Sequence, residues 1–506
     1  MGTSGWPPQV TTRSLVDGQL LLEEHPLQHP LVAHERARIT RCCLAVVACA
    51  SLGAAVAGVA FAAFFGSDPA YREFNFQPPR PLEQPDAGCA DNPIARLVRL
   101  RLSHMRDELA AIRDASPSRL SAAHAAWRAR HSCLRGVNLG SWLVLERWLL
   151  TPGETIETLS GTIASPFTGE RLSAARDEFT LSRLLRARGE LGRLEAFRER
   201  FVTRRDFEHL VRLGIKTVRI PFGYWLVSQN DTTPYIRGRG VEYLDRALAW
   251  AEELGLFVLL DLHAAPGGQS GEQQSGHVDA GWRPSDFDAD ASVEVVRLVA
   301  RRYVNRRVLI GIELLNEPTL PAQLALSYYA RAIAAVRQEG MRAEDVAIVI
   351  NLYDMSRLLS PDSVWRALLA GLPPAENVVA DLHLYYAFLP PLLDQLPLCF
   401  VVGELVNRQT EWLGLLGFPT LVGEWSLRVP WHGPQAAEFR ALPPNQQAEL
   451  LAAFGRRQIA AIASQNNSVG GFFWTWAAPS SEEQWGYRNA IDNGWLAREA
   501  WPGSCV

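Results

Sequence analysis

The segment that decides the fold is residues 217–262, where TVRI at 217–220 is followed by VEYLDRALAWAEELG at 241–255 and then by FVLLDL at 257–262. The two outer runs are short and apolar, which is typical of buried strands. The middle run repeats apolar residues at helical spacing along one face. A strand, a helix and a second strand in this order predict two parallel strands joined by a helical crossover.

The same alternation continues on both sides of this segment, and a further amphipathic stretch, LALSYYARAIAAVRQEG, occupies 324–340. The strand-like runs are Arg135–Leu139, Thr217–Ile220, Phe257–Leu262, Leu309–Leu315, Val346–Asn351, Val378–Leu384, Thr420–Val422 and Gly471–Trp476. Eight repeats over about 370 residues predict an α/β fold, the (β/α)8 TIM barrel. A doubly wound sheet is the alternative, but it would need a glycine-rich phosphate loop after the first strand, and NLGSW at 138–142 is not one.

Residues 42–66 predict a transmembrane signal anchor, because CCLAVVACASLGAAVAGVAFAAFF at 42–65 has no charge and about 20 apolar residues span a bilayer. Arg36, Arg38 and Arg41 precede this run. The positive-inside rule then predicts a single-pass type II membrane protein, with residues 1–41 as a disordered cytosolic tail and the remainder extracellular or lumenal. A cleaved signal peptide is the alternative, although the polar leader before the span is long for one.

Residues 67–131 predict a connection between the membrane segment and a compact domain. Six prolines between residues 69 and 93 favour a stiff, extended stalk. Residues 94–130 have a helical pattern, which we interpret as a helical spacer that packs on the domain. The compact domain is therefore expected at residues 132–506.

Cysteines and glycosylation sequons agree with that topology. Four of the seven cysteines lie beyond the span, where disulfides are permitted, and they allow three connectivities: Cys89, Cys133, Cys399 and Cys505. The sequons Asn230-Asp231-Thr232 and Asn466-Asn467-Ser468 predict glycosylation of Asn230 and Asn466.

The active site of such a barrel forms at the C-terminal ends of its strands, so polar and aromatic residues that end a run, lie near its end or follow it are candidates. These are Glu146, Arg219, Asp261, His263, Asn316, Glu317, Asp381, His383, Tyr385, Glu424, Trp425, Trp474 and Trp476. Glycosidic bond cleavage needs one protonated carboxyl group, which donates to the leaving oxygen, and one ionised carboxylate, which attacks or activates water. Glu317 and Glu424 end the fourth and seventh runs, which face each other roughly across the mouth. A short gap and retention of configuration are therefore expected.

The neighbours of these two residues suggest their roles. The amide of Asn316 can hold the sugar 2-hydroxyl group. Arg219 and the hydroxyl of Tyr385 are expected beside Glu424, where Arg219 would favour the charged form. Glu424 is therefore the expected nucleophile. Glu317 is the expected acid/base, with its pKa raised by burial and by the charge of the nucleophile.

Several motifs give a family resemblance: RGVNLGSWLVLE at 135–146, VRIPFGYW at 218–225, DLHAAPGGQSG at 261–271, GIELLNEP at 311–318, DLHLYYAF at 381–388, VGEW at 422–425 and FFWTW at 472–476. With them, the chain from about residue 135 to residue 505 resembles glycoside hydrolase family 5, and within it the fungal-type exo-β-1,3-glucanases. The resemblance implies the same roles for Glu317 and Glu424, and a disulfide between Cys399 and Cys505. It implies a glucose subsite lined by Glu146, Arg219, His263, Asn316, His383, Tyr385 and Trp476.

The leaving-group side departs from this family. Fungal exo-glucanases place a Phe near Glu272, where it clamps the leaving glucose, and an Asn near Gln274. Phe388 keeps the second aromatic residue of the clamp, whereas Leu382 and Leu384 replace histidines that flank His383. The linkage that the enzyme prefers is left open by these differences.

The expected function is hydrolysis of terminal β-1,3-linked glucose from β-glucan by a retaining β-glucosidase. Alternatives on the same barrel are an endo-β-glucanase, a transglycosylase, or a glucosidase for β-1,6-glucan or glycolipid. An inactive carbohydrate-binding surface protein is the alternative from another class. The expected partners are β-glucan or a small β-glucoside and, through residues 42–66, a membrane; the chain is expected to be a monomer.

No cofactor or metal is expected, because the chemistry needs none, although Asp261, His263 and His383 are potential ligands. The net charge of −4 gives no support for nucleic-acid binding.

Overall fold

The computed structural model describes residues 92–114, 121–131, 133–228, 233–352, 376–389, 395–415 and 418–498. The predicted tail, membrane segment and most of the stalk lie outside these residues, as do Asn230 and Cys505. No helix within the described ranges is both long and apolar enough to cross a membrane. All described residues belong to one compact unit, Leu82–Val506.

Eight parallel strands close into a barrel, which confirms the predicted (β/α)8 fold. Their order around the barrel is β1, β10, β9, β8, β7, β6, β5, β4, and β1 pairs with both β10 and β4. The strands are β1 (Leu134–Asn138), β4 (Thr217–Gly223), β5 (Phe257–Ala264), β6 (Leu309–Glu313), β7 (Ala347–Asn351), β8 (Val378–Leu384), β9 (Thr420–Trp425) and β10 (Ser468–Phe473). Each predicted run overlaps one strand. The last strand ends earlier than predicted, at Phe473, so both Trp474 and Trp476 lie beyond it.

The strands are buried on both faces, as is usual for a parallel sheet covered by helices. In β5, Val258, Leu260 and Leu262 pack in the large core between the barrel and its helices. Leu259 belongs instead to the cluster inside the barrel. Because side chains alternate along a strand, Asp261 shares the inward side with Leu259.

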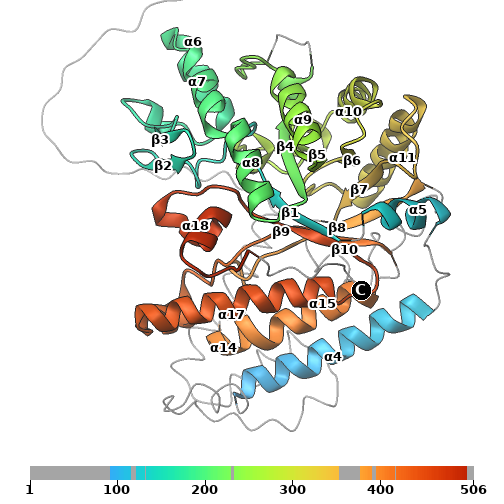
Figure 1. Ribbon diagram of the computed structural model, residues 1–506, viewed down its shortest axis with the longest axis vertical. Helices are drawn as coiled ribbons and strands as arrows, with labels where there is room; N and C mark the ends of the chain where they lie inside the picture. The colour runs from blue at the N-terminus through green and yellow to red at the C-terminus, as the bar shows by residue number, and fades with distance from the viewer. Residues whose placement is uncertain are drawn as a thin grey trace, which may run out of the picture. The chain divides into compact units, whose positions relative to one another are not determined.

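Helices surround the barrel, as Figure 1 shows. They are α4 (Pro93–Asp114), α5 (Ala122–Arg130), α6 (Glu178–Arg188), α7 (Gly192–Phe201), α8 (Arg204–Arg212), α9 (Glu242–Leu254), α10 (Ala289–Tyr303), α11 (Ala322–Gln338), α14 (Leu398–Phe400), α15 (Val406–Leu415), α16 (Gly433–Ala441), α17 (Pro444–Ala463) and α18 (Tyr487–Asp492). In α9, Tyr243, Ala247 and Ala251 recur at four-residue spacing and are buried, and the helix ends at Gly255, whose φ of 72° suits glycine. An antiparallel hairpin, β2 (Thr155–Thr158) and β3 (Gly161–Ala164), follows β1.

The N-terminal end of the barrel is closed by α5, part of the predicted helical spacer. Trp127 is only 2% exposed and belongs to the apolar cluster inside the barrel. Its indole N–H donates to the carbonyl oxygen of Ile310 at 2.9 Å. The preceding helix, α4, lies beside α15 (Figure 1), and Arg99 there forms a 2.7 Å ion pair with Glu404. Both helices are thus part of the packed unit.

The described part of the chain includes two of the predicted disulfide cysteines and one of the two sequons. Cys133 and Cys399 are each disulfide-bonded. Since Cys505 lies outside the described residues, its pairing with Cys399 stays a prediction. Asn466 is exposed in the turn before β10, a position that a glycan can reach. Glycosylation of Asn466 and of Asn230 also stays a prediction.

Candidate active site

A fully buried arginine organises the C-terminal end of the barrel. The guanidinium of Arg219, on β4, donates to Glu313 at 2.7 Å, to Asn138 and Glu424 at 2.9 Å and to Asn316 at 3.0 Å, and lies 3.0 Å from Asp261. Burial by itself lowers the pKa of Arg219, but the three carboxylates raise it well above its usual value. Arg219 therefore remains a cation that holds five residues from four strands or their ends in place.

The two predicted catalytic carboxylates meet at this end of the barrel. His383 Nδ1 lies 2.7 Å from Glu317 Oε1 and 3.3 Å from Glu424 Oε2. One oxygen of each carboxylate and a ring nitrogen of His383 all lie within 4.8 Å of one another. Residues more than 100 positions apart in the chain therefore share one small site.

Glu424, at the end of β9, is held by two donors. Arg219 Nη1 donates to its Oε1 at 2.9 Å, and the hydroxyl of Tyr385 donates to its Oε2 at 2.5 Å. Arg219 and Tyr385 are the two residues that were predicted from the sequence to lie beside Glu424. A carboxylate with both oxygens held by strong donors is fixed in orientation, which suits in-line attack on a bound atom.

Glu317, which follows β6, has a different environment. Its φ of 39° is in the left-handed region, which non-glycine residues seldom adopt and which often occurs at functional sites. Its Oε2 accepts a 2.9 Å hydrogen bond from the amide of Gln274, in the short helix η4 (Gln273–Ser275). The sequence did not predict this contact, because it joins the loop after β5 to the loop after β6.

The order of the two carboxyl pKa values is the reverse of the predicted one. Burial raises the pKa of Glu424 to about 7, although His383 and Arg219 act in the opposite direction. Burial acts on Glu317 in the same way, but the hydrogen bond and the charge of His383 bring its pKa below the usual value. The expectation of a raised pKa for Glu317 is therefore wrong. The cause is His383, whose ring lies closer to Glu317 than to Glu424.

Several buried polar atoms at this end of the barrel have no hydrogen-bond partner within the described residues, among them Glu146 Oε1, Asp261 Oδ1, His263 Nε2 and Asn316 Nδ2. His263 Nε2 lies 3.6 Å from Glu146 Oε1, so the two atoms are close but not bonded. Burial by itself lowers the pKa of His263, yet Asp261 and Glu146 raise it to about 10. Unpaired buried polar atoms are uncommon, and a ligand rich in hydroxyl groups would satisfy both donors and acceptors.

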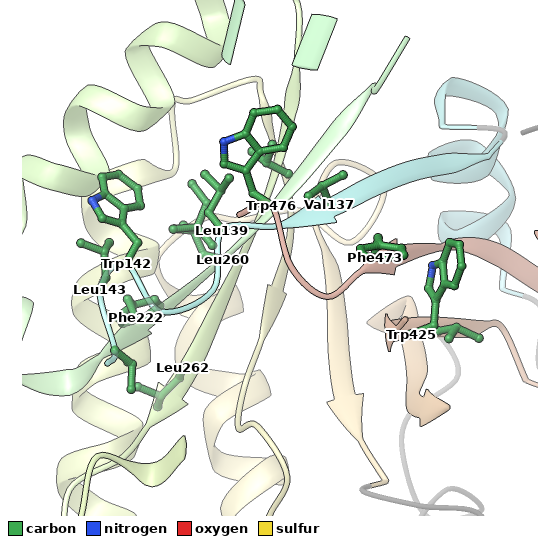
Figure 2. Close-up of a cluster of buried hydrophobic side chains, with 14 of the residues drawn as sticks. Val137, Leu139, Trp142, Leu143, Phe222, Leu260, Leu262, Trp425, Phe473 and Trp476 are labelled. Atoms are coloured by element: carbon green, nitrogen blue, oxygen red, sulfur yellow. The ribbon is translucent and has the colours of Figure 1, made fainter. Parts of the chain in front are cut away.

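Trp476 does not line this site, which corrects the sequence-based prediction. It is buried in the core between the barrel and the helices, near Leu139 and Leu260 in Figure 2, and its indole N–H donates to Asp206 at 2.9 Å. Trp474, rather than Trp476, lies beside the predicted site residues. The ring of Trp474 stacks on that of His263 with centroids 5.6 Å apart and planes 8° apart.

The remaining aromatic residues form a group beside the carboxylates. Trp148, Tyr385, Trp474 and Trp485 pack in one small cluster. Trp148 also donates its indole N–H to Glu146 at 2.7 Å. Phe388, predicted to clamp the leaving sugar, is 51% exposed, and its ring centroid lies 6.0 Å from that of Tyr385.

A second layer of polar residues beneath the carboxylates was missed. Asn351, at the end of β7, donates to Glu313 at 3.2 Å and to Asp381 at 3.3 Å, and its amide lies 2.8 Å from His383 Nε2. Asn138 links Arg219 to the backbone of Gly423. The sequence did contain a signal for this layer. Side chains two residues apart in a strand point to the same side, so Asn351 points into the barrel as Val349 does.

Two groups of residues have the spacing of metal ligands: Glu313, Asp381 and His383, and Glu317, His383 and Glu424. In the first group Glu313 is already paired with Arg219, which supplies the positive charge. The second group is the carboxylate pair itself. The expectation that no metal takes part stays a prediction.

Comparison with known proteins identifies the family to which the chain belongs. The family model described as Cellulase (glycosyl hydrolase family 5) matches residues 191–479, which include both carboxylates. Probable glucan 1,3-beta-glucosidase A of Aspergillus niger is 32% identical over 324 residues, which cover 63% of this chain and 71% of that protein. Probable glucan 1,3-beta-glucosidase A of Aspergillus terreus is 29% identical over 434 residues, which cover 78% of this chain and 96% of that protein.

Among solved structures, a rutinosidase from Aspergillus niger superimposes with a TM-score of 0.56 and 20% identity. The match covers 73% of this chain and 99% of the rutinosidase. At this level of identity the likeness supports the barrel fold alone.

Proposed function

Because this chain belongs to glycoside hydrolase family 5 and is a glycosidase, we propose that it is a retaining exo-β-1,3-glucosidase that releases terminal glucose from β-glucan. The carboxylate pair is the observation on which the mechanism depends. One oxygen of Glu317 and one of Glu424 lie within 4.8 Å of each other. Such a short distance between two of their oxygens supports the roughly 5–5.5 Å carboxyl separation of retaining enzymes over the roughly 6.5–9.5 Å of inverting ones.

In the first step Glu424 attacks the anomeric carbon, and the bond from that carbon to the leaving oxygen breaks. The bonding electrons go to the leaving oxygen, which takes a proton from Glu317. Burial by itself lowers the pKa of His383, but Glu424 and Asp381 raise it well above the usual value, so His383 is a cation beside Glu317. Its Nδ1 lies 2.7 Å from Glu317 Oε1, so the two groups can share one proton, and the developing charge on the leaving oxygen draws that proton onto Glu317 and then onto the leaving group.

In the second step a water molecule attacks the glucosyl ester, Glu317 takes its proton, and Glu424 leaves as a carboxylate. Arg219 and Tyr385 stabilise the charge of Glu424 as it is released, since both donate to its oxygens. The amide of Asn316, whose Nδ2 has no partner within the described residues, is available to the 2-hydroxyl of the sugar. Its hydrogen bond to the 2-hydroxyl becomes stronger as charge develops at the anomeric carbon, and it thereby stabilises the transition state.

The relatives support the choice of substrate, because both are named as glucan 1,3-beta-glucosidases. Action at chain ends is supported by the loops that close one side of the site. Trp148, after β1, packs on Trp485, after β10, with centroids 4.9 Å apart. Ser481 donates to Glu154 at 2.8 Å and joins the same two loops. A site enclosed on this side favours a terminal sugar over the middle of a chain.

We propose a type II membrane location for the same reason given by the sequence: residues 42–65 are uncharged and follow a basic segment. Protease treatment of sealed membrane vesicles tests this location. The barrel should be protected inside secretory vesicles and digested only after detergent is added. Digestion of the barrel in intact vesicles would reject it.

Incubation of the full-length protein with laminarin tests the reaction. Glucose should appear from the first time point, and proton NMR should detect its β-anomer before mutarotation. Oligosaccharides as early products, without glucose, would reject exo action, and α-glucose as the first anomer would reject retention. The Glu424→Gln variant, prepared in the same way, controls for contaminating glucosidases.

The assignment of roles has its own test. A 2-deoxy-2-fluoro-β-glucosyl fluoride slows hydrolysis of the glucosyl ester more than its formation, so the ester should accumulate. Peptide mass spectrometry should find the label on Glu424. A label on Glu317 would reverse the two roles.

A further inference from the structure

Two exposed aromatic rings lie outside the carboxylate pair, in the loops after β8 and β9. Phe388 is 51% exposed and Trp431 44% exposed, and their ring centroids are 5.3 Å apart with planes at 85°. The other large exposed hydrophobic residues of the described chain are aliphatic and lie on or next to helices: Leu100, Leu191 and Val211. Scattered aliphatic residues need no explanation, whereas a contacting pair of exposed aromatic rings beside an active site does.

A continuous series of contacts leads from the nucleophile to this pair. Tyr385 donates to Glu424 at 2.5 Å, and its ring meets that of Phe388 edge to face at 6.0 Å. Phe388 then meets Trp431 in the same manner. The buried ring of Trp485 also lies 6.0 Å from Phe388 and supports it from inside. The two exposed rings therefore extend the active site toward the surface.

The surroundings of Trp431 suit a sugar better than an apolar partner. The guanidinium of Arg428 lies 5.9 Å from the ring centroid of Trp431 and 3.9 Å from Glu482. An exposed ring gives a flat apolar surface for the C–H groups of a pyranose, and a charged pair nearby can bond its hydroxyl groups. An interface for an apolar protein surface would instead be depleted of charge at this point.

We propose that Trp431 extends the clamp predicted at Phe388 into an outer subsite, where its ring binds a further glucose unit of the leaving β-glucan chain. The inference rests on the proposed exo action. If the terminal glucose occupies the enclosed site at Glu317 and Glu424, every further unit of the substrate lies on the leaving side. The outer subsite then makes the enzyme favour chains over small glucosides, because only a chain reaches Trp431.

The test compares substrates of increasing length. Trp431→Ala should lower kcat/KM for laminaripentaose about 3- to 10-fold, the range expected for loss of one aromatic contact. It should leave kcat/KM for an aryl β-glucoside unchanged, because that substrate does not reach the ring. Trp431→Phe should restore most of the loss, and Leu191→Ala, an exposed hydrophobic residue removed elsewhere, should change neither substrate.

Each other outcome has a distinct meaning. An equal loss for laminaripentaose and the aryl glucoside would overturn the inference, since Trp431 would then act by supporting the site itself. Unchanged kinetics at every length would also overturn it. A wild-type protein that cleaves the aryl glucoside but none of the β-1,3-linked oligosaccharides would instead reject the proposed function on which the inference depends.

Discussion

The two ends of the barrel are built from the same eight strands but have opposite chemistry. In three strands of the barrel the inward residues change from apolar to polar toward the C-terminal end: Leu259 to Asp261 in β5, Val349 to Asn351 in β7, and Val379 to Asp381 in β8. Below this change the interior is an apolar cluster capped by Trp127. Above it, charged groups are buried and paired around Arg219.

This difference separates stability from function. The apolar cluster around Trp127 forms the floor of the barrel. Burial of its apolar surface stabilises the fold roughly in proportion to the buried area. The mouth buries carboxylates that must be desolvated, and such arrangements seldom add net stability. We therefore expect variants at the mouth to lose activity while remaining folded, and variants at the floor to lose stability while remaining active.

The largest effect is expected for Glu424→Gln. Its kcat should fall by at least about 10³-fold, because the amide cannot form the ester intermediate. Its melting temperature should stay level or rise, since one buried charge is removed. Turnover of an aryl glucoside and thermal unfolding measure the two quantities. Activity within tenfold of wild type would remove Glu424 from the mechanism.

At the opposite end, Trp127→Ala should lower the free energy of unfolding by about 3–5 kcal/mol, the usual range for deletion of a buried Trp. The kcat/KM of the folded protein should remain within about twofold of wild type, because no described contact joins Trp127 to the carboxylates. Denaturant unfolding and kinetics at low temperature provide the measurements. Trp127→Phe, which keeps an aromatic ring, should lose less stability. A loss of activity in the folded Trp127→Ala protein would contradict the expectation that this end of the barrel contributes to stability alone.

A smaller loss is expected for Asn316→Ala. Removal of a donor to the sugar 2-hydroxyl should cost about 2–3 kcal/mol in the transition state, or roughly 30- to 150-fold in kcat/KM. A 2-deoxyglucoside provides the matched control, because it already lacks the hydroxyl group and should respond much less to the substitution. An equal loss on both substrates would show that Asn316 acts instead through Arg219.

The smallest effect, measured apart from any fall in the maximal rate, is a shift of the pH profile. The pKa of Glu424 is raised to about 7, so the nucleophile becomes protonated as the pH falls below that value and kcat/KM should decline on the acid side. His383 lowers the pKa of Glu424, so His383→Gln should move this acid limb to higher pH by about one unit. Measurement of kcat/KM against pH tests this sign. An acid limb that moved to lower pH would contradict it.

Strand positions could be predicted well because the signal is local. TVRI and FVLLDL are short apolar runs, and the stretch between them has helical spacing, so β4, α9 and β5 follow from neighbouring residues alone. The site could be predicted in part, because the ends of parallel strands must meet at one edge. That geometry places Glu317, Glu424, His383 and Arg219 together before any distance is known.

Features that depend on the path of the chain beyond a strand could not be predicted. Trp474 and Trp476 are two residues apart and would point the same way in a regular strand. Since β10 ends at Phe473, the chain turns and sends Trp474 to the active site and Trp476 into the core. The insertion of Trp127 into the barrel floor is equally invisible in a helix with no strong apolar stripe.

The amino-acid sequence by itself determined the barrel, the pair of acidic residues and the donors around Glu424, because these follow from local periodicity and from the order of the strands. Only the tertiary structure decided which tryptophan faces the sugar site, which amide holds Glu317 and which carboxyl group has the higher pKa. Those properties depend on distances of a few ångströms between residues far apart in the chain and on their burial. Neither quantity is encoded in any single stretch of sequence.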